Sequence, residues 1–320
     1  MIRQHGKLTF LSFLLVVLCG NTFAQKIPVI PLDLDSLITV GYATGSLKTL
    51  SGSVEKITEK QMNKDQVTNP LEAIRGRVPG LTIQRGTNGL AALDAVRLRG
   101  TTSLTSGNDP LIIVDGVFGD LSMLTSIYPT DIESFTILKD ASETAQYGSR
   151  GASGVIEVTT KKGMQGRTQV AYNGSFGIST VYKNLKMLSG DEFRSVASER
   201  GISILDKGNN TNFQKEIQQT GLQQNHHVAF YGGSSTSSYR VSLGFMDRQG
   251  VILNEDMKNF TSNMNMNQKM FDGFFDCELG MFGSILKNHN LVDYQKTFYS
   301  AATFNPTYPN HKDPVTNSWD

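Results

Sequence analysis

One stretch decides the fold of this chain: Pro110–Lys162, PLIIVDGVFGDLSMLTSIYPTDIESFTILKDASETAQYGSRGASGVIEVTTKK. It contains two apolar runs, Leu111–Val114 and Gly154–Thr160, and each is interrupted abruptly by polar residues or glycine. Short apolar runs rich in β-branched residues and bounded by turn residues predict buried strands. Phe135–Leu138 lies between them and predicts a third strand. We therefore expect a small mixed domain here.

The same stretch predicts a helix of about two turns, from Asp140 to Gly148, because Asp can accept hydrogen bonds from first-turn N–H groups and Gly tolerates a left-handed C-terminus. Gly148, Gly151 and Gly154 follow at intervals of three. Glycine at such positions indicates positive φ or close backbone approach. We expect a tight glycine turn after the helix.

This ordered run of motifs resembles the plug domain of TonB-dependent outer-membrane receptors, and the SusC/RagA family in particular. Two parts of the wording carry the resemblance: VDGV at Val114–Val117, and DIES through YGSRGASGVIEVTTKKG at residues 131–163. The resemblance implies a mixed α/β plug followed by a large antiparallel transmembrane β-barrel. The plug-motif residues that it marks are Asp115, Gly116, Asp140, Gly148, Arg150, Gly151 and Gly154.

The first 24 residues predict a secretory signal peptide, with basic residues before Leu8, an apolar run over Leu8–Gly20 and cleavage after Ala24. A membrane anchor is the rival interpretation, but the run is short of the ~20 residues that span a bilayer. Lipidation at Cys19 is disfavoured because Leu18 is bulky. Cleavage would leave Cys277 as the remaining cysteine, so no internal disulfide is expected.

Composition restricts the other classes. The net charge is +1 with the charges mixed along the chain, so no basic field for nucleic acid is expected. Beyond the N-terminus no segment is apolar enough for a helical span, so a membrane role would use β structure. The 31 glycines against 9 prolines favour a β-rich or mixed protein with many turns over a helical bundle.

Residues 25–44 are expected to be a periplasmic tether that carries a TonB box. The box is assigned to Leu37, Ile38, Thr39 and Val40, a short strand-forming segment upstream of the plug. Such a segment can add as a strand to the sheet edge of a partner. The alternative is an ordinary first strand of the plug. Many members of the family that the sequence resembles carry an immunoglobulin-like domain before the box, and none is expected in this chain.

The plug is expected over residues 45–163. Further strands are predicted at Gly52–Thr58, Leu81–Arg85 and Ala95–Arg99. Asn69-Pro70 predicts the start of a helix that runs to about Arg75, because Asn caps well and Pro is tolerated at the first helical position.

Arg97 and Arg99 alternate within a predicted strand, so we expect them to share one face. Inside a barrel, arginines on such a face would pair with carboxylates of the wall and fix the position of the plug. A solvated charged face is the alternative. The prediction assigns both arginines to the contact between plug and barrel.

Residues 164–320 predict the first strands of the barrel. Alternation recurs over Arg167–Thr180, Gln223–Gly233, Tyr239–Gly250, Asn259–Met270 and Phe274–Lys287. Phe271-Asp272-Gly273 predicts a hairpin turn, and Asp191–Arg200 predicts a helix after the first strand. One apolar and one polar face over ten or more residues is typical of transmembrane barrel strands.

About five strands cannot close a barrel, and a barrel around a folded plug takes about 22. The chain stops at Asp320 within a polar stretch. We therefore expect the sequence to be the front third of a receptor, either a piece of a longer chain or the product of a broken gene.

The sequence lacks the motifs that we would expect of catalysis, of cofactor binding or of metal binding. The glycine turn lacks the Lys of a P-loop, and neither HExxH nor GxSxG occurs. His226 and His227 are adjacent on a predicted strand, so they point to opposite faces and cannot both bind one metal. Asp115, Asp131 and Asp140 lie at element ends, where capping is expected in preference to acid–base catalysis. We predict no enzyme, no cofactor and no metal site.

The resemblance implies import of glycan or peptide oligomers across the outer membrane of a Gram-negative bacterium, with the plug facing the periplasm. The implied partners are TonB, a SusD-like surface lipoprotein and outer-membrane lipid. Two alternatives stay open: a TonB-dependent siderophore or vitamin receptor, and a stand-alone periplasmic plug module that binds partners. The second is disfavoured because the alternating strands would be exposed.

Overall fold

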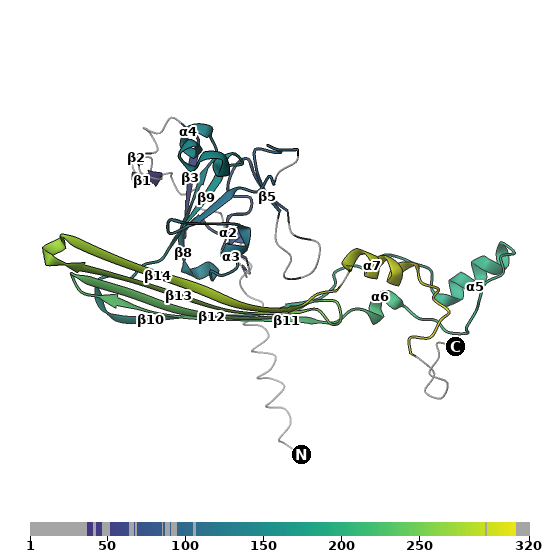
Figure 1. Ribbon diagram of the computed structural model, residues 1–320. Helices are drawn as coiled ribbons and strands as arrows, with labels where there is room; N and C mark the ends of the chain where they lie inside the picture. Colours follow the sequence, from purple (N-terminus) through teal and green to yellow (C-terminus); the bar gives the residue numbers. More distant parts are fainter. Residues whose placement is uncertain are drawn as a thin grey trace, which may run out of the picture. The chain divides into compact units, whose positions relative to one another are not determined.

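The computed structural model describes residues 37–40, 43–46, 52–63, 67, 69–84, 86, 90, 95–104, 107–291 and 293–311, and for residues 37–46 it describes the backbone alone. The predicted signal peptide and the tether up to residue 36 lie outside these residues. The described chain contains two separate five-stranded sheets and two small two-stranded sheets. Figure 1 shows the elements coloured along the sequence.

The N-terminal domain (residues 52–163) is built on the sheet β3-β8-β9-β6-β7. Its strands are β3 (Val54–Thr58), β6 (Leu111–Val114), β7 (Val117–Gly119), β8 (Ile132–Leu138) and β9 (Val155–Thr160). A two-stranded sheet of β4 (Leu81–Gln84) and β5 (Ala95–Leu98) accompanies it. The short helices are α2 (Pro70–Ile74), α3 (Leu121–Leu124), α4 (Ala141–Thr144) and the 3₁₀ segments η1 (Pro129–Asp131) and η2 (Ala145–Gly151).

Both faces of the central strands of this sheet are buried. Phe135, Ile137 and Ile156 are completely buried and belong to the main cluster, which also takes up the apolar side chains of α2, α3 and β5. Leu138, Val155 and Ile113 form a smaller cluster on the other face. The predicted strands are confirmed, and β8 begins three residues earlier than Phe135 because Ile132 is also buried and paired.

Local sequence rules explain the predicted helix start at Asn69. The Asn69 side chain accepts a hydrogen bond from the Leu71 N–H at 3.0 Å, and Pro70 occupies the first helical position. The prediction for residues 140–148 is partly wrong. One α-turn, α4, is followed by 3₁₀ turns with a kink at Gly148, where φ is 58° and ψ is −147°.

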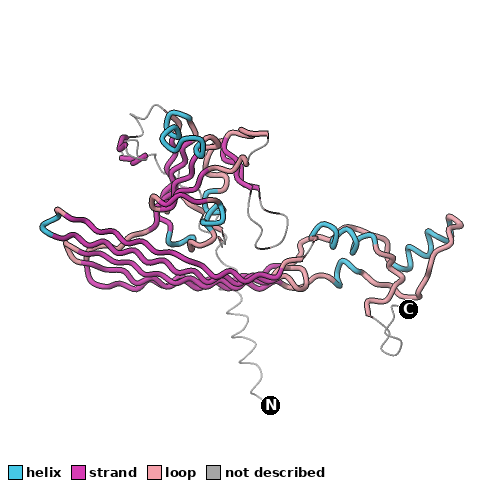
Figure 2. The backbone as a smooth tube through the Cα atoms, viewed as in Figure 1, coloured by secondary structure: helices cyan, strands magenta, loops and turns pink. Residues whose placement is uncertain are grey.

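The second five-stranded sheet, called the long sheet, has the order β10-β11-β12-β13-β14, and every neighbouring pair is antiparallel. Its strands are β10 (Gly166–Ser179), β11 (Gly221–Gly233), β12 (Ser237–Gln249), β13 (Asp256–Met270) and β14 (Phe275–His289). Figure 2 shows them running side by side over their whole length. The five strands predicted after residue 163 are therefore confirmed.

The connections of the long sheet are unequal. Short turns join β11 to β12 and β13 to β14, and in the second turn Phe271, Asp272 and Gly273 all have positive φ. Residues 180–220, between β10 and β11, contain α5 (Gly190–Glu199) and α6 (Phe213–Glu216), and α7 (Tyr294–Thr303) follows β14. Because the strands alternate in direction, all three helices lie at the end opposite the short turns (Figure 1).

The two faces of the long sheet reverse the pattern of a water-soluble sheet. On β12, Leu243 and Phe245 are exposed, whereas Arg240 and Ser242 on the opposite face are buried. The exposed face continues across the sheet through register partners such as Phe245, Phe260 and Ile285. An apolar outer face and a polar inner face are the arrangement of a transmembrane β-barrel wall, which in this chain is open at β10 and β14.

Among the described residues, no helix is both long enough and apolar enough to cross a lipid bilayer.

Candidate functional site: the contact between the N-terminal domain and the long sheet

The N-terminal domain contacts the polar face of the long sheet through two of its segments. The first, called the docking segment, is residues 125–131, which connects α3 to β8. The second, called the exit segment, is residues 160–162, at the end of β9. Both segments combine backbone and side-chain groups with polar residues of β11 to β14.

Asp131 is the centre of the first contact. The side chain of Arg240 donates a hydrogen bond from Nη2 to Asp131 Oδ1 at 2.8 Å, and Ser242 Oγ donates to Asp131 Oδ2 at 2.5 Å. The Asp131 side chain is 3% exposed and that of Arg240 is 8% exposed. A buried carboxylate is costly unless it is paired and fully hydrogen-bonded, and the wall of the sheet supplies these partners.

Tyr128 packs beside this ion pair. Its ring stacks on the His227 ring, with centroids 4.6 Å apart and an interplanar angle of 19°. His227 and Gly244 are register partners on β11 and β12. A Cβ added to Gly244 would lie 2.4 Å from Tyr128 Cδ2, so only glycine leaves room for the tyrosine ring there.

His227 lies close to the Asp131 carboxylate as well as packing against Tyr128. Its Nε2 lies 3.1 Å from Asp131 Oδ1. Neither ring nitrogen has a hydrogen bond of good geometry within the described chain. Arg240 and Ser242 are therefore the hydrogen-bonded partners of Asp131, and His227 is a close neighbour that stacks on Tyr128.

The pKa values of the docking segment follow from this environment. Burial alone would raise the pKa of Asp131, but its contacts with His227, Ser242 and Arg240 outweigh burial and hold the pKa below its ordinary value. Burial and then the nearby charge of Asp131 raise the pKa of Tyr128 to about 12. At neutral pH the carboxylate is ionised and the phenol is neutral.

Two further hydrogen bonds lie at the start of the docking segment. Asn259 Nδ2 donates to the Thr125 carbonyl at 3.2 Å, and Ser284 Oγ donates to Ser126 Oγ at 3.1 Å. The docking segment thus runs along the polar face of the long sheet, from the register position of Asn259 to that of Arg240.

The exit segment is bonded through Thr160. Its hydroxyl donates to Asp115 Oδ2 at 2.6 Å and accepts a hydrogen bond from Asn265 Nδ2 at 3.2 Å. Lys162 forms an ion pair with Glu278 of β14. At Gly163 a Cβ would lie 2.5 Å from the Tyr239 backbone N, so glycine is required where the chain crosses the start of β12.

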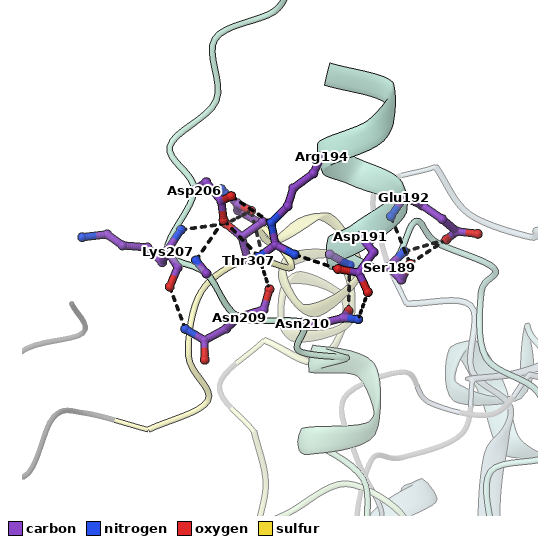
Figure 3. Close-up of polar contacts among 12 residues, drawn as sticks. Ser189, Asp191, Glu192, Arg194, Asp206, Lys207, Asn209, Asn210 and Thr307 are labelled. Carbon is purple, nitrogen blue, oxygen red and sulfur yellow. Dashed lines mark hydrogen bonds and ion pairs between the residues drawn. The ribbon is translucent and has the colours of Figure 1, made fainter. Parts of the chain in front are cut away.

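Another polar cluster orders the long connections at the far end of the sheet (Figure 3). Arg194 of α5 donates from Nε to Asp206 at 2.8 Å and from Nη2 to the Asn209 carbonyl at 2.7 Å. The Asn209 N–H in turn donates to the Thr307 carbonyl at 3.0 Å. This cluster ties residues 189–211 to the segment after α7.

Comparison with known proteins identifies the two parts. Residues 46–155 match the family model described as TonB-dependent Receptor Plug Domain. The chain is 38% identical over 252 residues to the TonB-dependent receptor SusC of Bacteroides thetaiotaomicron, covering 75% of this chain and 25% of that protein. The chain belongs to the SusC/RagA family of TonB-dependent receptors.

Two other relatives support the same family. TonB-dependent receptor P3 of Formosa agariphila is 34% identical over 266 residues, covering 83% of this chain and 26% of that protein. The RagAB peptide importer in its open-open state superposes with a TM-score of 0.74 at 26% identity, covering 81% of this chain and 33% of that chain. The chain thus spans a quarter to a third of the length of these relatives. The N-terminal domain is the plug, and the long sheet is part of the receptor barrel.

The plug-motif residues lie inside the plug. Asp115 and Gly116, with φ of 46° and 84°, form the turn between β6 and β7, and the Asp115 carboxylate also accepts a hydrogen bond from Thr160 N–H at 2.9 Å. Gly154 has φ of 91°, and a Cβ there would lie 2.4 Å from Leu98 Cδ1. At Gly151 a Cβ would lie 2.8 Å from the Thr144 carbonyl oxygen, so the predicted close approach is confirmed. Arg150 is exposed.

The capping role predicted for three aspartates is wrong. Asp140 stands before α4, but its carboxylate accepts a hydrogen bond from Ser53 N–H at 2.5 Å and pairs with Arg99. Hydrogen bonds from Ser53 and from Arg99 hold the pKa of Asp140 below its ordinary value. Asp115 binds Thr160, and Asp131 binds the wall. In each case the carboxylate accepts hydrogen bonds from residues that are distant in the sequence.

The shared face predicted for Arg97 and Arg99 is also wrong. Arg99 lies beyond the end of β5 with φ of 58°, so the two side chains do not alternate along one strand. Within the described chain, Arg97 donates to Thr101 Oγ1 at 3.1 Å and Arg99 pairs with Asp140. A pairing of either arginine with carboxylates of the barrel wall stays a prediction.

The proposed TonB box, Leu37–Val40, forms β1 and pairs with β2 (Ala43–Ser46) in a separate two-stranded sheet. The side chains of both strands lie outside the described residues. β1 is not a strand of the plug sheet. The role of the box as a partner strand stays a prediction.

Sequence reasoning missed the wall partners of the plug. His226 and His227 do lie on opposite faces, as predicted, since His227 is buried and His226 is exposed. Arg240 was a usable signal: its neighbours on the inward face of the strand are Ser238, Ser242 and Gly244, none of which carries a charge. A charge buried on that face requires a counter-charge.

Proposed function

We propose that this receptor imports glycan or peptide oligomers across the outer membrane, with the plug as its gate and TonB as the source of mechanical work. The observation that supports this is the placement of a folded plug on the polar face of strands whose other face is apolar. The plug is attached by a few bonds of high specificity, chiefly Asp131 to Arg240 and Ser242. Such contacts hold the plug in a defined position without a large apolar interface.

The topology of the plug suggests how work could reach it. The proposed box at Leu37–Val40 precedes β3, and among the described strands β3 is an edge strand whose partner is β8. An edge strand can be removed without breaking the remaining ladder. Tension applied at the box would therefore act first on β3, while the docking and exit segments hold the rest of the plug to the wall.

The orientation and partners follow from the same proposal. In bacterial barrels the short turns face the periplasm and the long connections face the exterior. The turns at residues 234–236 and 271–274 would then be periplasmic, and α5 to α7 would lie outside, where a SusD-like lipoprotein would meet them. The exposed apolar face of the long sheet would contact outer-membrane lipid. The proposed activity is transport, without a catalytic step.

The test is Leu37→Pro in cells that depend on the receptor, with uptake measured for labelled neutral oligosaccharides, oligopeptides and a ferric siderophore. Proline removes a backbone donor and restricts the neighbouring dihedral angles, so strand pairing with TonB should fail and uptake should be lost. Leu37→Ala is the matched control, because it keeps the N–H and should retain uptake.

Receptor abundance in the outer membrane must be equal in all strains. Undiminished uptake by Leu37→Pro would overturn the assignment of the box. Uptake of the siderophore alone would overturn the assignment of the substrate class.

A further inference from the structure

The chain enters the plug sheet beside the segment that follows β8. Residues 52 and 53, the first described residues of the N-terminal domain, directly precede β3. The paired part of β3 and β8 begins one residue later, with Val54 opposite Leu138. Tension carried along the chain from the proposed box at Leu37–Val40 would pass through residues 52 and 53 before it reached β3. These two residues are therefore the first part of the domain that such tension would load.

Two carboxylates bind the backbone amides of these residues. Glu143 Oε1 accepts a hydrogen bond from the Gly52 N–H at 2.9 Å. Asp140 Oδ2 accepts a hydrogen bond from the Ser53 N–H at 2.5 Å. Hydrogen bonds to an ionised acceptor are roughly twice as strong as those between neutral groups. We call these two contacts the entry latch.

The entry latch depends on the absence of a side chain at position 52. A Cβ added to Gly52 would overlap the carboxylate of Glu143. Gly52 does not belong to the glycines with positive φ, so the contact uses its small size and not a left-handed backbone. Glu143 is 7% exposed, so its carboxylate is largely shielded from water. Shielding strengthens the bond to the Gly52 N–H.

Lys139 strengthens the same junction. Its N–H donates to the Ser53 carbonyl at 3.3 Å. Its Nζ lies 2.6 Å from Glu55 Oε2 of β3, and the Lys139 side chain is 7% exposed. The segment from Lys139 to Glu143 therefore contacts the start of the domain through backbone and side-chain groups at three residues, Gly52, Ser53 and Glu55.

Each carboxylate of the entry latch has a second partner within the plug. Asp140 Oδ1 accepts a hydrogen bond from Arg99 Nη1, and Glu143 Oε2 accepts one from Ser142 Oγ at 2.5 Å. In both carboxylates one oxygen thus binds the entering chain and the other binds the plug. Loss of the amides would leave neither carboxylate without a partner, so the large cost of an unpaired buried charge does not arise. Arg99 and Ser142 are positioning residues for a contact that can open and re-form.

We propose that Asp140 and Glu143 form a reversible latch, which holds residues 52–53 at rest, releases them when the tether carries tension and binds them again when the tension ends. The proposal rests on the proposed function and adds the residues that set how much tension is needed. Because the latch precedes β3 in the chain, it would respond before any bond between β3 and β8.

The first test is amide hydrogen exchange of the receptor in detergent without TonB, measured by mass spectrometry on peptides that contain residues 48–58. Glu143→Ala removes the acceptor of the Gly52 N–H, and we expect exchange in this peptide to become about ten times faster, because a bond to a charged group is lost. Glu143→Gln keeps an oxygen for Gly52 and presents an N–H to the Ser142 hydroxyl, so exchange should return to near the original rate. Glu133→Ala is the matched control, because it removes an exposed carboxylate from β8.

Gly52→Ala tests the same contact from the other side. The added methyl group would displace the Glu143 carboxylate while every residue of α4 stays unchanged. We expect faster exchange at residues 48–58 here too, with exchange at residues 132–138 of β8 still slow, which shows that the core remains folded. Unchanged exchange at residues 48–58 in both Glu143→Ala and Gly52→Ala would overturn the latch.

Release under tension is measured by pulling on the tether of the receptor in a lipid bilayer. Ser36→Cys supplies the attachment point, together with Cys277→Ser because Cys277 is exposed. We expect the force at the first extension to be lower in Glu143→Ala and Gly52→Ala than in Glu143→Gln and Glu133→Ala. The first extension of the unsubstituted latch should recur at the same force in successive cycles of pulling and relaxation.

Two results of the pulling experiment would contradict the proposal. Equal forces in all four variants would overturn the role of the latch under tension. A first extension that does not recur after relaxation would overturn its reversibility.

Pulling at Ser36→Cys does not depend on TonB, so the two levels of proposal can fail separately. If Leu37→Pro stops uptake and the four variants release at equal force, TonB-driven import stands and the latch is overturned. If Leu37→Pro does not stop uptake, the proposed function fails, and the proposed trigger of the latch fails with it.

Discussion

The plug sheet and the long sheet are both five-stranded, yet they bury opposite kinds of side chain. In the plug, Phe135, Ile137 and Ile156 are buried, as in any water-soluble core. In the long sheet, Asn263, Arg240 and Ser242 are buried, and Phe245 and Phe260 are exposed. Strands with the same two-residue periodicity therefore occur in both environments. The chemistry of the buried face indicates whether water or lipid surrounds the sheet.

The comparison also shows how the two sheets meet. The polar inner face of the long sheet would be costly to bury against an apolar surface, because each unpaired polar group loses hydrogen bonds to water. The docking segment meets it with a carboxylate, a hydroxyl and a carbonyl, so the contact is made by bonds of defined geometry. This contact is therefore well defined in its geometry.

The largest effect is expected from a substitution in the apolar core of the plug. The matched control is a substitution on the outer face of the long sheet. Phe135→Ala should lower the stability of the plug by about 3–5 kcal/mol, because it leaves a cavity around a completely buried site. Phe260→Ala removes the same ring from an exposed position and should change plug stability little. Urea unfolding of the receptor in detergent, followed by protease sensitivity of the plug, measures both. Equal effects would contradict the assignment of the two faces.

The next largest effect is expected from a substitution in the contact between the plug and the long sheet. Asp131→Ala leaves the Arg240 guanidinium buried without its counter-charge, and removal of one partner of such a pair costs about 3–5 kcal/mol. We expect the plug to be digested by protease at a lower urea concentration while the barrel keeps its heat-modifiable migration. The double variant Asp131→Ala with Arg240→Met should recover part of the loss. No recovery would show that the ion pair is not the relevant contact.

A third substitution tests whether the outer face of the long sheet contacts lipid. Phe260→Arg places a charge on the face that we assign to lipid, and a charge near the middle of such a face costs about 2–4 kcal/mol. Thr261→Arg would instead put the charge on the adjacent inward position and is expected to disturb the plug. The yield of heat-modifiable barrel in outer-membrane fractions distinguishes the two, since only the first should lower barrel assembly directly.

The smallest effect concerns pH. Because the pKa of Tyr128 is raised to about 12 in the folded receptor, its neutral form contributes stability that is present below the unfolded pKa of about 10 and is lost as pH rises toward 12. The urea midpoint of the plug should fall over this window. Tyr128→Phe keeps the ring stacked on His227 and should remove the step. A step of equal size in Tyr128→Phe would assign it to another group.

The lowered pKa of Asp131 has the opposite sign. Its folded pKa is below its ordinary value, so its contribution is present at neutral pH and is lost only as pH falls below the normal range of a carboxylate. The Asp131 carboxylate itself therefore contributes no pH dependence near neutrality.

The sequence alone determined several features that depend on neighbouring residues. The alternation in β12 and β14, the Asn69-Pro70 helix start and the turn at Phe271–Gly273 are consequences of side-chain periodicity and local backbone preference, which act over a few residues. The sequence motifs between Val114 and Gly163 also indicated the family.

Only the tertiary structure decided which polar groups pair. Asp131 and Arg240 are 109 residues apart, and neither has a local partner that would indicate the other. The roles of Asp115 and Asp140 were mistaken for the same reason, since Thr160 and Ser53 reach them only through the fold. A buried charge takes its partner from whichever surface is docked against it, and that surface exists only after both sheets have formed.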